Sequence, residues 1–460
     1  MTASKTNAYN ELFGRWLTGR NGFTPIQANK LKIIAQPALE VSAGKIRCRR
    51  CGQKTGKKRA LLPHGQYYCP RCLNFGRLTS LDTLYTISEP NFFEPPKQIL
   101  TWKGQLSPYQ QKTAKRLLQT IDQQETFLLW AVTGAGKTEI LFPALARAFA
   151  QGKRVCLASP RIDVCNELYP RLMSAFSQIS LVLLHGQQQQ KYRYTQLVIC
   201  TTHQLIRFVA AFDVLIVDEV DAFPFRNNAW LSYAVQTARK KNSTLLLLTA
   251  TPTKQLLRQV HKGRLAFGYL PLRYHGYLLP QPQVFCEMAW KKKIAKGEVP
   301  ARLKRILLTW IKQQKPFLVF VPRITLLAPV YRAICRVLPS KIQGTTVHAS
   351  DVQRSAKVAK MRLGEYHFLV TTTILERGVT FPRLNVVVLG ADDEIFMQSV
   401  LVQIAGRVGR SRACPTGDVY FICTMQNTEI KAACKQIAFV NRKGRRMKNE
   451  MLSALPKKKI

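Results

Sequence analysis

The stretch Ala131 to Glu139, AVTGAGKTE, decides the fold of this 460-residue chain. It directly follows an apolar run, Phe127 to Trp130, and it opens a segment, ILFPALARAFA, whose composition favours a helix. A strand, a glycine-rich loop and a helix in this order predict a phosphate-binding loop, because backbone N–H groups and the positive end of a helix attract phosphate. A glycine-rich turn that binds no nucleotide is the alternative, and the flanking strand and helix argue against it.

The loop contains the residue types that a nucleotide site needs. Gly134 and Gly136, on either side of Ala135, let the backbone approach phosphate oxygens closely. Lys137 is placed to neutralise the β- and γ-phosphates, and the Thr138 hydroxyl is placed to hold Mg²⁺. We therefore expect ATP and Mg²⁺ as cofactors.

An acidic pair supplies the expected hydrolytic chemistry. Four apolar residues, Val214 to Val217, precede Asp218 and Glu219 in the run VLIVDEVDAFPF. This places the pair at the carboxyl end of a buried parallel strand, where open α/β sheets bind their ligands. We expect Asp218 to reach the Mg²⁺ held by Thr138 through water, and Glu219 to polarise the water that attacks the γ-phosphate.

The next apolar run, STLLLLTATPT, ends in two more hydroxyl side chains. Those of Thr249 and Thr251 are candidates for relaying the nucleotide state towards a nucleic acid. A turn in which they only close the strand is the alternative.

A second α/β pattern follows residue 300 and lacks a phosphate loop of its own. Its segment QIAGRVGR contains Gln403, Arg407 and Arg410, and residues three or four apart share one face of a helix. We expect both arginines to stabilise charge on the transferring phosphoryl group, as arginine fingers do, with Gln403 beside the nucleotide. Ordinary surface arginines are the alternative in so basic a chain.

Lys and Arg exceed Asp and Glu by 70 to 25, a formal charge of +45. This excess predicts a polyanionic partner, and the nucleotide motifs favour nucleic acid over an anionic membrane surface. No apolar run approaches the roughly 20 residues that span a bilayer, and the first residues carry no recognisable secretion signal, so we expect a cytoplasmic protein.

Four cysteines form a metal-ligand pattern, Cys48-x-x-Cys51 and then Cys69-x-x-Cys72. This spacing is typical of a zinc ribbon, in which four thiolates bind Zn²⁺ tetrahedrally and leave no open position for catalysis. Two disulfides or four unrelated thiols are the alternatives, and disulfides do not persist in a cytosolic enzyme.

Basic and aromatic residues surround these cysteines and suit phosphate contacts and base stacking. A solvated basic face around a bracing zinc is the alternative. The residues are Arg47, Arg49, Arg50, Lys57, Lys58, Arg59, Tyr67, Tyr68 and Phe75.

Together these patterns predict an α/β protein with two RecA-like parallel-sheet domains in tandem and an N-terminal four-Cys zinc module. The expected divisions are an extension (1–44), the zinc module (45–80), a Pro-rich connector (81–104), domain 1 with the ATP site (105–290), a hinge (291–300), domain 2 with the arginine fingers (301–440) and a frayed basic tail (441–460).

The ordered motifs AVTGAGKTE, ASPR, TTHQL, VDEVD, TATPT, ILERGVTFP and QIAGRVGR resemble those of superfamily 2 helicases over residues 105–425. The resemblance implies that Gln110 reads the adenine. It also implies a strand path lined in the first domain by Pro160, Arg161, Thr201 and Thr202, and in the second by Thr372, Thr373 and Gly378.

The segment DEVDAFPF and a four-Cys module ahead of the motor domains resemble the late competence protein ComFA family of Gram-positive bacteria. That family implies an ATPase stimulated by single-stranded DNA, acting at the inner face of the cell membrane on transforming DNA. Its expected partners are a phosphoribosyltransferase-like competence protein and the membrane DNA-uptake channel, and a homo-oligomer stays open. The replication-restart helicase PriA has a similar motor, but its zinc ligands lie between and after its helicase motifs, whereas this helicase half contains no Cys-x-x-Cys pair.

The leading hypothesis is an ATP-driven translocase on single-stranded DNA. A superfamily 2 helicase of repair or replication restart is the alternative within the same class. A non-catalytic zinc-containing scaffold that only binds nucleic acid is the alternative from another class, and the complete set of phosphate-loop, acidic and arginine motifs argues against it.

Overall fold

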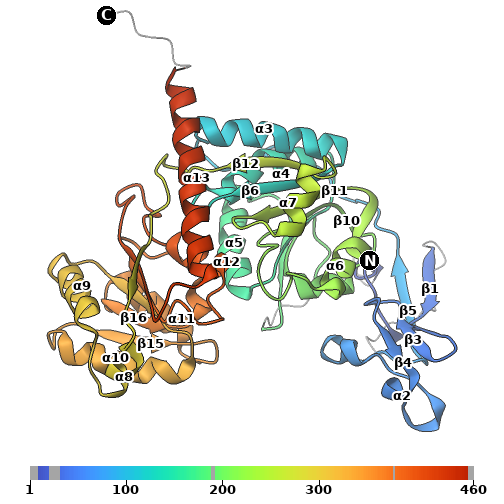
Figure 1. Ribbon diagram of the computed structural model, residues 1–460. Helices are drawn as coiled ribbons and strands as arrows, with labels where there is room; N and C mark the ends of the chain where they lie inside the picture. The colour runs from blue at the N-terminus through green and yellow to red at the C-terminus, as the bar shows by residue number, and fades with distance from the viewer. Residues whose placement is uncertain (1–8, 20–31, 188–191, 377–378, 454–460) are drawn as a thin grey trace, which may run out of the picture. The chain divides into compact units, whose positions relative to one another are not determined.

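The computed structural model describes residues 9–19, 32–187, 192–376 and 379–453 (Figure 1). Its contacts divide the chain into two compact units. The first unit comprises Met1–Gln105, Lys112–Leu129 and Thr138–Gly268, and the second comprises Leu106–Gln111, Trp130–Lys137 and Tyr269–Ile460. None of the described helices is long and apolar enough to span a bilayer.

A seven-stranded sheet carries the predicted phosphate loop and acidic pair. In spatial order the strands are β12 (Ala266–Leu270), β6 (Thr126–Ala131), β11 (Arg239–Thr249), β10 (Phe212–Val217), β7 (Val155–Ser159), β9 (Leu197–Thr201) and β8 (Leu181–Leu184). Strands β11, β10, β7 and β9 pair in parallel, and β7 and β9 are buried at every residue, which explains their mostly apolar sequences.

Helices alternate with these strands along the chain, as a doubly wound sheet requires (Figure 1). They are α3 (Pro108–Gln123), α4 (Lys137–Ala150), α5 (Ile162–Ala175), α6 (Ala229–Ala238) and α7 (Lys254–His261). A short 3₁₀ helix, η5 (Thr202–Arg207), follows β9.

A second sheet of six strands forms the other RecA-like domain. All of its described pairings are parallel. In spatial order the strands are β13 (Gln283–Cys286), β18 (Val419–Cys423), β17 (Asn385–Leu389), β14 (Phe317–Phe320), β16 (Phe368–Thr371) and β15 (Gly344–Val347). Its helices are α8 (Trp290–Ala295), α9 (Ala301–Lys312), α10 (Leu327–Val337), α11 (Arg354–Leu363), α12 (Gln398–Ala405) and α13 (Thr428–Ser453), with 3₁₀ turns η6 (Ile324–Leu326) and η7 (Thr373–Glu376).

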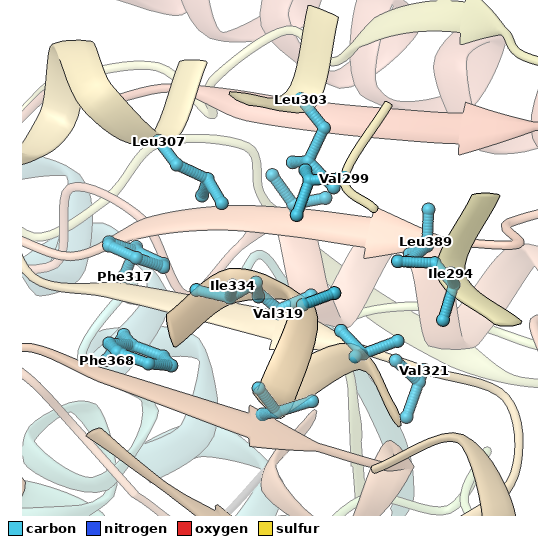
Figure 2. Close-up of a cluster of buried hydrophobic side chains, with 14 of the residues drawn as sticks. Ile294, Val299, Leu303, Leu307, Phe317, Val319, Val321, Ile334, Phe368 and Leu389 are labelled. Atoms are coloured by element: carbon cyan, nitrogen blue, oxygen red, sulfur yellow. The ribbon is translucent and has the colours of Figure 1, made fainter. Parts of the chain in front are cut away.

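Figure 2 shows the core on one side of this second sheet, where helix and strand side chains interdigitate. Phe317 and Val319 of β14 pack with Leu303 and Leu307 of α9, and all four are fully buried. Leu303 and Leu307 are four residues apart, so they project from the same face of the helix. The prediction of two RecA-like parallel-sheet domains is therefore confirmed.

The predicted hinge at 291–300 is wrong, because this segment belongs to the second domain. Trp290 and Ile294 lie one turn apart on α8 and are buried in the core of the second sheet. The lysines of WKKKIAK cover the outer face of an amphipathic helix, which resembles a polar linker when only the composition is considered. The second unit begins earlier, at Tyr269, and β13 already pairs with β18.

The basic segment that begins at Asn441 also continues an element. It forms the second half of α13, which runs to Ser453, and residues 454–460 lie outside the described part. Asn441 is buried, and its side-chain amide exchanges hydrogen bonds with the backbone of Leu279. Its anchoring argues against a frayed tail over residues 441–453.

The N-terminal segments form a small β module in the first unit. Two antiparallel sheets, β1 with β5 and β2 with β3 and β4, hold the predicted extension and the cysteine segment together. The elements are β1 (Ile33–Pro37), β2 (Leu39–Val41), β3 (Lys45–Cys48), β4 (Lys54–Gly56), α2 (Lys57–Ala60), η3 (Pro63–Gly65), η4 (Pro70–Phe75) and β5 (Thr83–Ile87).

This module packs on the first domain through α6 and η5. Its core includes Trp230 and Leu231 of α6 and Ile206 of η5. Gly52, at a left-handed φ of 71°, lies against the ring of Tyr233, where a Cβ atom would come within 2.8 Å of ring carbons. The Tyr233 hydroxyl also donates a hydrogen bond to the Arg49 carbonyl.

A buried ion pair joins the connector to the first sheet. The side chains of Arg154 and Glu89 are both fully buried and in direct contact, and Tyr194 donates a hydrogen bond to the same carboxylate. The Arg154 guanidinium also donates to the Phe13 and Thr195 carbonyls at 3.0 and 3.1 Å. A charge in such a place is tolerated only while it is paired and hydrogen-bonded.

We expect Glu89→Ala to lower the free energy of unfolding of the first unit by about 3–5 kcal/mol, because it leaves the Arg154 charge buried without its counter-ion. Urea unfolding followed by circular dichroism measures this loss. Glu94→Ala, at an exposed position of the same connector, is the matched control. Equal unfolding midpoints for Glu89→Ala and Glu94→Ala would contradict a stabilising role for the buried ion pair between Arg154 and Glu89.

Candidate nucleotide site and strand groove

The phosphate loop has the local geometry that the sequence predicts. Gly134 and Gly136 adopt left-handed φ angles of 79° and 73°, which other residues rarely adopt. Lys137 is the first residue of the 14-residue helix α4, so the N–H groups of its first turn are available for phosphate oxygens. Thr138 is buried in that turn.

Gln110 lies against the phosphate loop. Its side-chain amide donates a 2.9 Å hydrogen bond to the Ala135 carbonyl, and its side-chain oxygen accepts one from the Ser107 backbone N–H at 2.8 Å. The side chain is 5% exposed. Gln110 is therefore fixed in contact with the loop.

The acidic pair follows β10 directly. The Asp218 carboxylate accepts a 2.8 Å hydrogen bond from the Glu219 backbone N–H, which orients it at the strand end. Glu219 has a φ of 55°, a conformation that costs a non-glycine residue roughly 1–3 kcal/mol. Strain of this kind concentrates at functional sites, where surrounding structure holds a side chain in one direction.

Asp221 links the acidic segment to the end of the adjacent strand, β11. One of its carboxylate oxygens accepts a hydrogen bond from the Thr249 hydroxyl at 2.5 Å, and the other accepts one from Thr251 at 2.6 Å. All three residues are buried. The two threonines thus do more than close a turn, and Asp221 is a residue that the sequence reading missed.

The arginine motif differs from the prediction. Helix α12 ends at Ala405, with Gly406 as its C-cap and Gly409 in a left-handed turn. Arg407 and Arg410 follow the helix and do not share one helical face, so that prediction is wrong.

The two arginines also differ in exposure. Arg407 is 1% exposed, whereas Arg410 is partly exposed and donates to the Thr380 hydroxyl at 3.3 Å. Gln403 is buried within α12.

The predicted path residues of the second domain follow β16. Thr372 and Thr373 are half-buried at the end of this strand, and Thr373 begins η7. Gly378 lies outside the described residues.

In the first domain, a groove of about 670 Å³ contains part of the predicted path. Pro160 and Thr201 line it, whereas Arg161 and Thr202 are not among its lining residues. Thr202 is buried and Arg161 is the N-cap of α5.

The groove also brings together residues that the sequence reading did not select. Arg207 and His203 of η5 and Arg15 of the N-terminal segment line it. His203 could have been found in the sequence, because it belongs to the TTHQL motif and directly follows Thr201 and Thr202, which were predicted to line the strand path. Arg15 and Arg207 are 192 positions apart, and only tertiary structure brings them together.

The four predicted metal ligands form one buried cluster. The sulfur atoms of Cys48, Cys51, Cys69 and Cys72 lie within 4.8 Å of one another. Tetrahedral zinc with Zn–S bonds of about 2.3 Å separates its sulfurs by about 3.8 Å. The Cys48–Cys72 and Cys51–Cys69 sulfur distances are 3.8 and 3.5 Å, so the cluster fits zinc.

Electrostatics around Cys72 suit a metal-bound thiolate. Hydrogen bonds with the other three thiols, followed by the charge of Arg50, lower the pKa of Cys72, whereas the same network and burial raise the pKa values of Cys48 and Cys51, so Cys72 ionises more readily than these two thiols. All four cysteines are free of disulfides, so the two-disulfide alternative is not what the structure contains.

Two of the basic residues around the cysteines brace the module. Arg50 donates hydrogen bonds to the Gly76 and Cys72 carbonyls. Arg49 donates to the Gln36 side chain at 2.8 Å and forms an ion pair with Glu40. These arginines already have partners within the protein, so the count of basic residues overstates the charge available to a ligand.

Comparison with known proteins agrees with the two-domain architecture. Residues 103–254 match a family model described as "Type III restriction enzyme, res subunit", and residues 298–412 match "Helicase conserved C-terminal domain". The fold is similar to that of the DEAD-box helicase Mss116 bound to single-stranded RNA, with a TM-score of 0.56 over 72% of this chain and 77% of that chain. Their sequence identity is 18%, so this likeness concerns the fold alone.

Two curated relatives cover nearly the whole chain. Competence protein ComFA of Bacillus subtilis is 42% identical over 89% of this chain and 88% of its own length. Competence protein ComFA of Streptococcus pneumoniae is 41% identical over 88% of this chain and 93% of its own length. With the two helicase-type domains and the four-Cys module in place, this chain belongs to the ComFA family of competence proteins.

Proposed function

We propose that this protein is a DNA-dependent ATPase that moves along single-stranded DNA. The observation that carries the proposal is the contact of Asp221 with Thr249 and Thr251. It connects the segment that contains the expected hydrolytic acids, Asp218 and Glu219, to the end of the neighbouring strand. A rearrangement of the acidic segment on hydrolysis would therefore be transmitted beyond the nucleotide.

In this proposal the phosphate loop holds ATP. Backbone N–H groups at the start of α4 and the Lys137 ammonium group bind the β- and γ-phosphates, while the Thr138 hydroxyl and, through water, Asp218 hold Mg²⁺. When bound, Mg²⁺ supplies positive charge that offsets the charge developing on the phosphates. Glu219 orients and polarises the attacking water.

The second domain contributes its arginines in the same proposal. Arg407 and Arg410 stabilise the transferring phosphoryl group when the two RecA-like domains close on ATP, with Gln403 and Gln110 beside the nucleotide. Alternate closing and opening then convert hydrolysis into movement along the strand, which contacts Pro160, Arg161 and Thr201 in one domain and Thr372, Thr373 and Gly378 in the other. Thr202, which the resemblance also places on this path, is fully buried and is not proposed as a contact.

Family membership supports a role in the uptake of transforming DNA. Both relatives carry the name competence protein. We extend the proposal to the location of the protein, which we place in the cytoplasm at the inner face of the membrane. There it would work with the DNA-uptake channel and a phosphoribosyltransferase-like competence partner, and it would be able to form homo-oligomers. Co-purification of tagged protein with that partner from competent cells tests the extension.

ATP hydrolysis measured with and without single-stranded DNA tests the proposal directly. We expect clear stimulation by single-stranded DNA and less by duplex DNA or RNA of equal length. Binding should weaken steeply with salt, with each neutralised phosphate adding about 0.7 to the magnitude of the log–log slope. Equal hydrolysis rates with and without DNA at low salt would contradict a DNA-dependent motor and leave a binding scaffold.

A further inference from the structure

The groove on the first unit has one wall that comes from the zinc module. Asn74 and Phe75, at the end of η4, line it together with Pro160 and Thr201 of the first domain. Phe75 lies three residues after Cys72 on the same 3₁₀ helix, so the metal cluster holds the element that presents it. The module therefore shapes a surface of the first domain.

The shared wall is aromatic and rigid. The rings of Phe75 and His203 are parallel to within 8°, with centroids 6.3 Å apart. Both rings pack against Trp230, with centroid distances of 5.8 and 5.5 Å, and Trp230 is itself 8% exposed. Burial lowers the pKa of His203, so at neutral pH the ring is uncharged and suited to stacking.

The groove is also cationic. The Nε atom of Arg207 is buried and has no hydrogen-bond partner, and no carboxylate among the described residues lies within salt-bridge distance of its guanidinium group. Burial, together with the charges of Arg15 and Arg50, lowers the pKa of Arg207 to about 10. Arg15 is paired with Glu11 at 3.4 Å, so Arg207 is the groove arginine whose charge has no carboxylate partner in the described part of the chain, and such a guanidinium group favours an anionic ligand.

We propose that the zinc module forms part of the DNA path itself: one unpaired base of single-stranded DNA stacks on the Phe75–His203 wall, and its phosphate binds Arg207. This rests on the proposed function, because it names residues by which the motor holds its strand. Aromatic rings beside a guanidinium group that has no carboxylate partner among the residues described match a nucleotide, which offers a π-face and a phosphate together. Stacking needs an unpaired base, which favours a single strand over a duplex.

The test compares an oligothymidine strand with an abasic strand of the same length, using the full-length protein and fluorescence anisotropy. Wild-type protein should bind the oligothymidine strand about tenfold more tightly, the effect of one stacked base. Phe75→Leu, which keeps an apolar side chain in the core but removes the ring, should reduce this preference to near one and leave binding of the abasic strand unchanged. Phe75→Tyr should retain the preference.

Arg207→Ala should act differently, since a phosphate contact does not depend on the base. We expect it to weaken binding of both strands equally and to reduce the magnitude of the salt slope by about 0.7. Leu73→Ala, on the same 3₁₀ helix, and Arg258→Ala, on α7, are matched controls at exposed positions outside the groove. Zinc content and melting temperature show that each variant is folded.

A Phe75→Leu variant that keeps the full preference for bases would overturn the stacking assignment, and an unchanged salt slope in Arg207→Ala would overturn the phosphate assignment. Photocrosslinking of wild-type protein with 5-iododeoxyuridine should label the peptide that contains Phe75 or His203, and labelling only elsewhere contradicts the path. If single-stranded DNA binds and stimulates hydrolysis while these tests fail, the proposed function stands without this site. If single-stranded DNA neither binds nor stimulates ATP hydrolysis, both the proposed function and the proposed stacking site are overturned.

Discussion

Glu219→Gln is expected to reduce the rate of DNA-stimulated ATP hydrolysis by about 10²–10⁴-fold, the usual contribution of a general base. The amide keeps the size of the side chain and its strained backbone position but cannot accept a proton. ATP binding should be preserved, because the phosphate loop and Thr138 are unchanged. Single-turnover hydrolysis and equilibrium binding of a fluorescent ATP analogue separate the two effects.

Lys137→Ala is expected to impair an earlier step than Glu219→Gln does, namely the binding of ATP. Without its ammonium group the loop loses the charge that neutralises the phosphates, so both nucleotide binding and hydrolysis should fall. Glu298→Gln makes the same chemical change as Glu219→Gln at an exposed position of the second unit and should hydrolyse ATP at the wild-type rate. Normal turnover in both Lys137→Ala and Glu219→Gln would show that the nucleotide site lies elsewhere.

Cys72→Ala is expected to abolish stoichiometric zinc binding and to lower the soluble yield. The four thiols belong to the same core as Trp230 and Leu231, so loss of the metal should loosen the packing of the module on α6. Metal analysis by mass spectrometry and the melting temperature give the two readouts. Treatment of wild-type protein with a strong chelator should reproduce the change in melting temperature.

Cys335→Ser provides the control for this variant. Cys335 is exposed and lies outside the metal cluster, so its replacement should leave one zinc per chain. A full complement of zinc in Cys72→Ala would refute a four-thiolate site. Loss of zinc with no change in stability would instead show that the metal does not brace the module.

Much of the fold could be predicted because buried parallel strands have a distinctive sequence. Runs such as Val214–Val217 are apolar on both faces and end where polar residues begin, so strand ends and the acidic pair that follows them are visible in the chain. The phosphate loop could also be predicted from its glycines, because the positive φ angles of Gly134 and Gly136 exclude most other residues. Both the apolar strand runs and the loop glycines are local features of the sequence, and the structure contains the strands and the loop that they predict.

The errors arose where burial depended on distant parts of the chain. Trp290 and Ile294 are surrounded by lysines in the sequence, and only the core beneath α8 identifies the segment as part of the second domain. The end of α12 at Ala405, capped by Gly406, separates Arg407 and Arg410 from the helix that their spacing suggested. Composition alone does not distinguish a linker from an amphipathic helix with so few apolar positions.

The groove could not be predicted for a related reason. Phe75, His203 and Arg15 come from three segments, and no periodicity in the sequence connects them. The sequence already suggested aromatic residues of the zinc module as candidates for base stacking, whereas the position of Phe75, rather than Tyr67 or Tyr68, in the groove depends on the packing of η4 against η5 and α6. Long-range contacts of this sort are a property of the folded chain.

The contact between Gly52 and Tyr233 has an evolutionary consequence. Any side chain at position 52 would collide with the ring at position 233 and would be strained at the left-handed φ of 71°, so a residue other than glycine is accepted there only after a smaller residue has arisen at position 233, and still at a cost in backbone strain. We therefore expect these two positions to vary together among related sequences, although 181 positions separate them. Such a constraint disfavours exchange of the cysteine module between unrelated motors, and it implies that module and motor domain have been inherited as one piece.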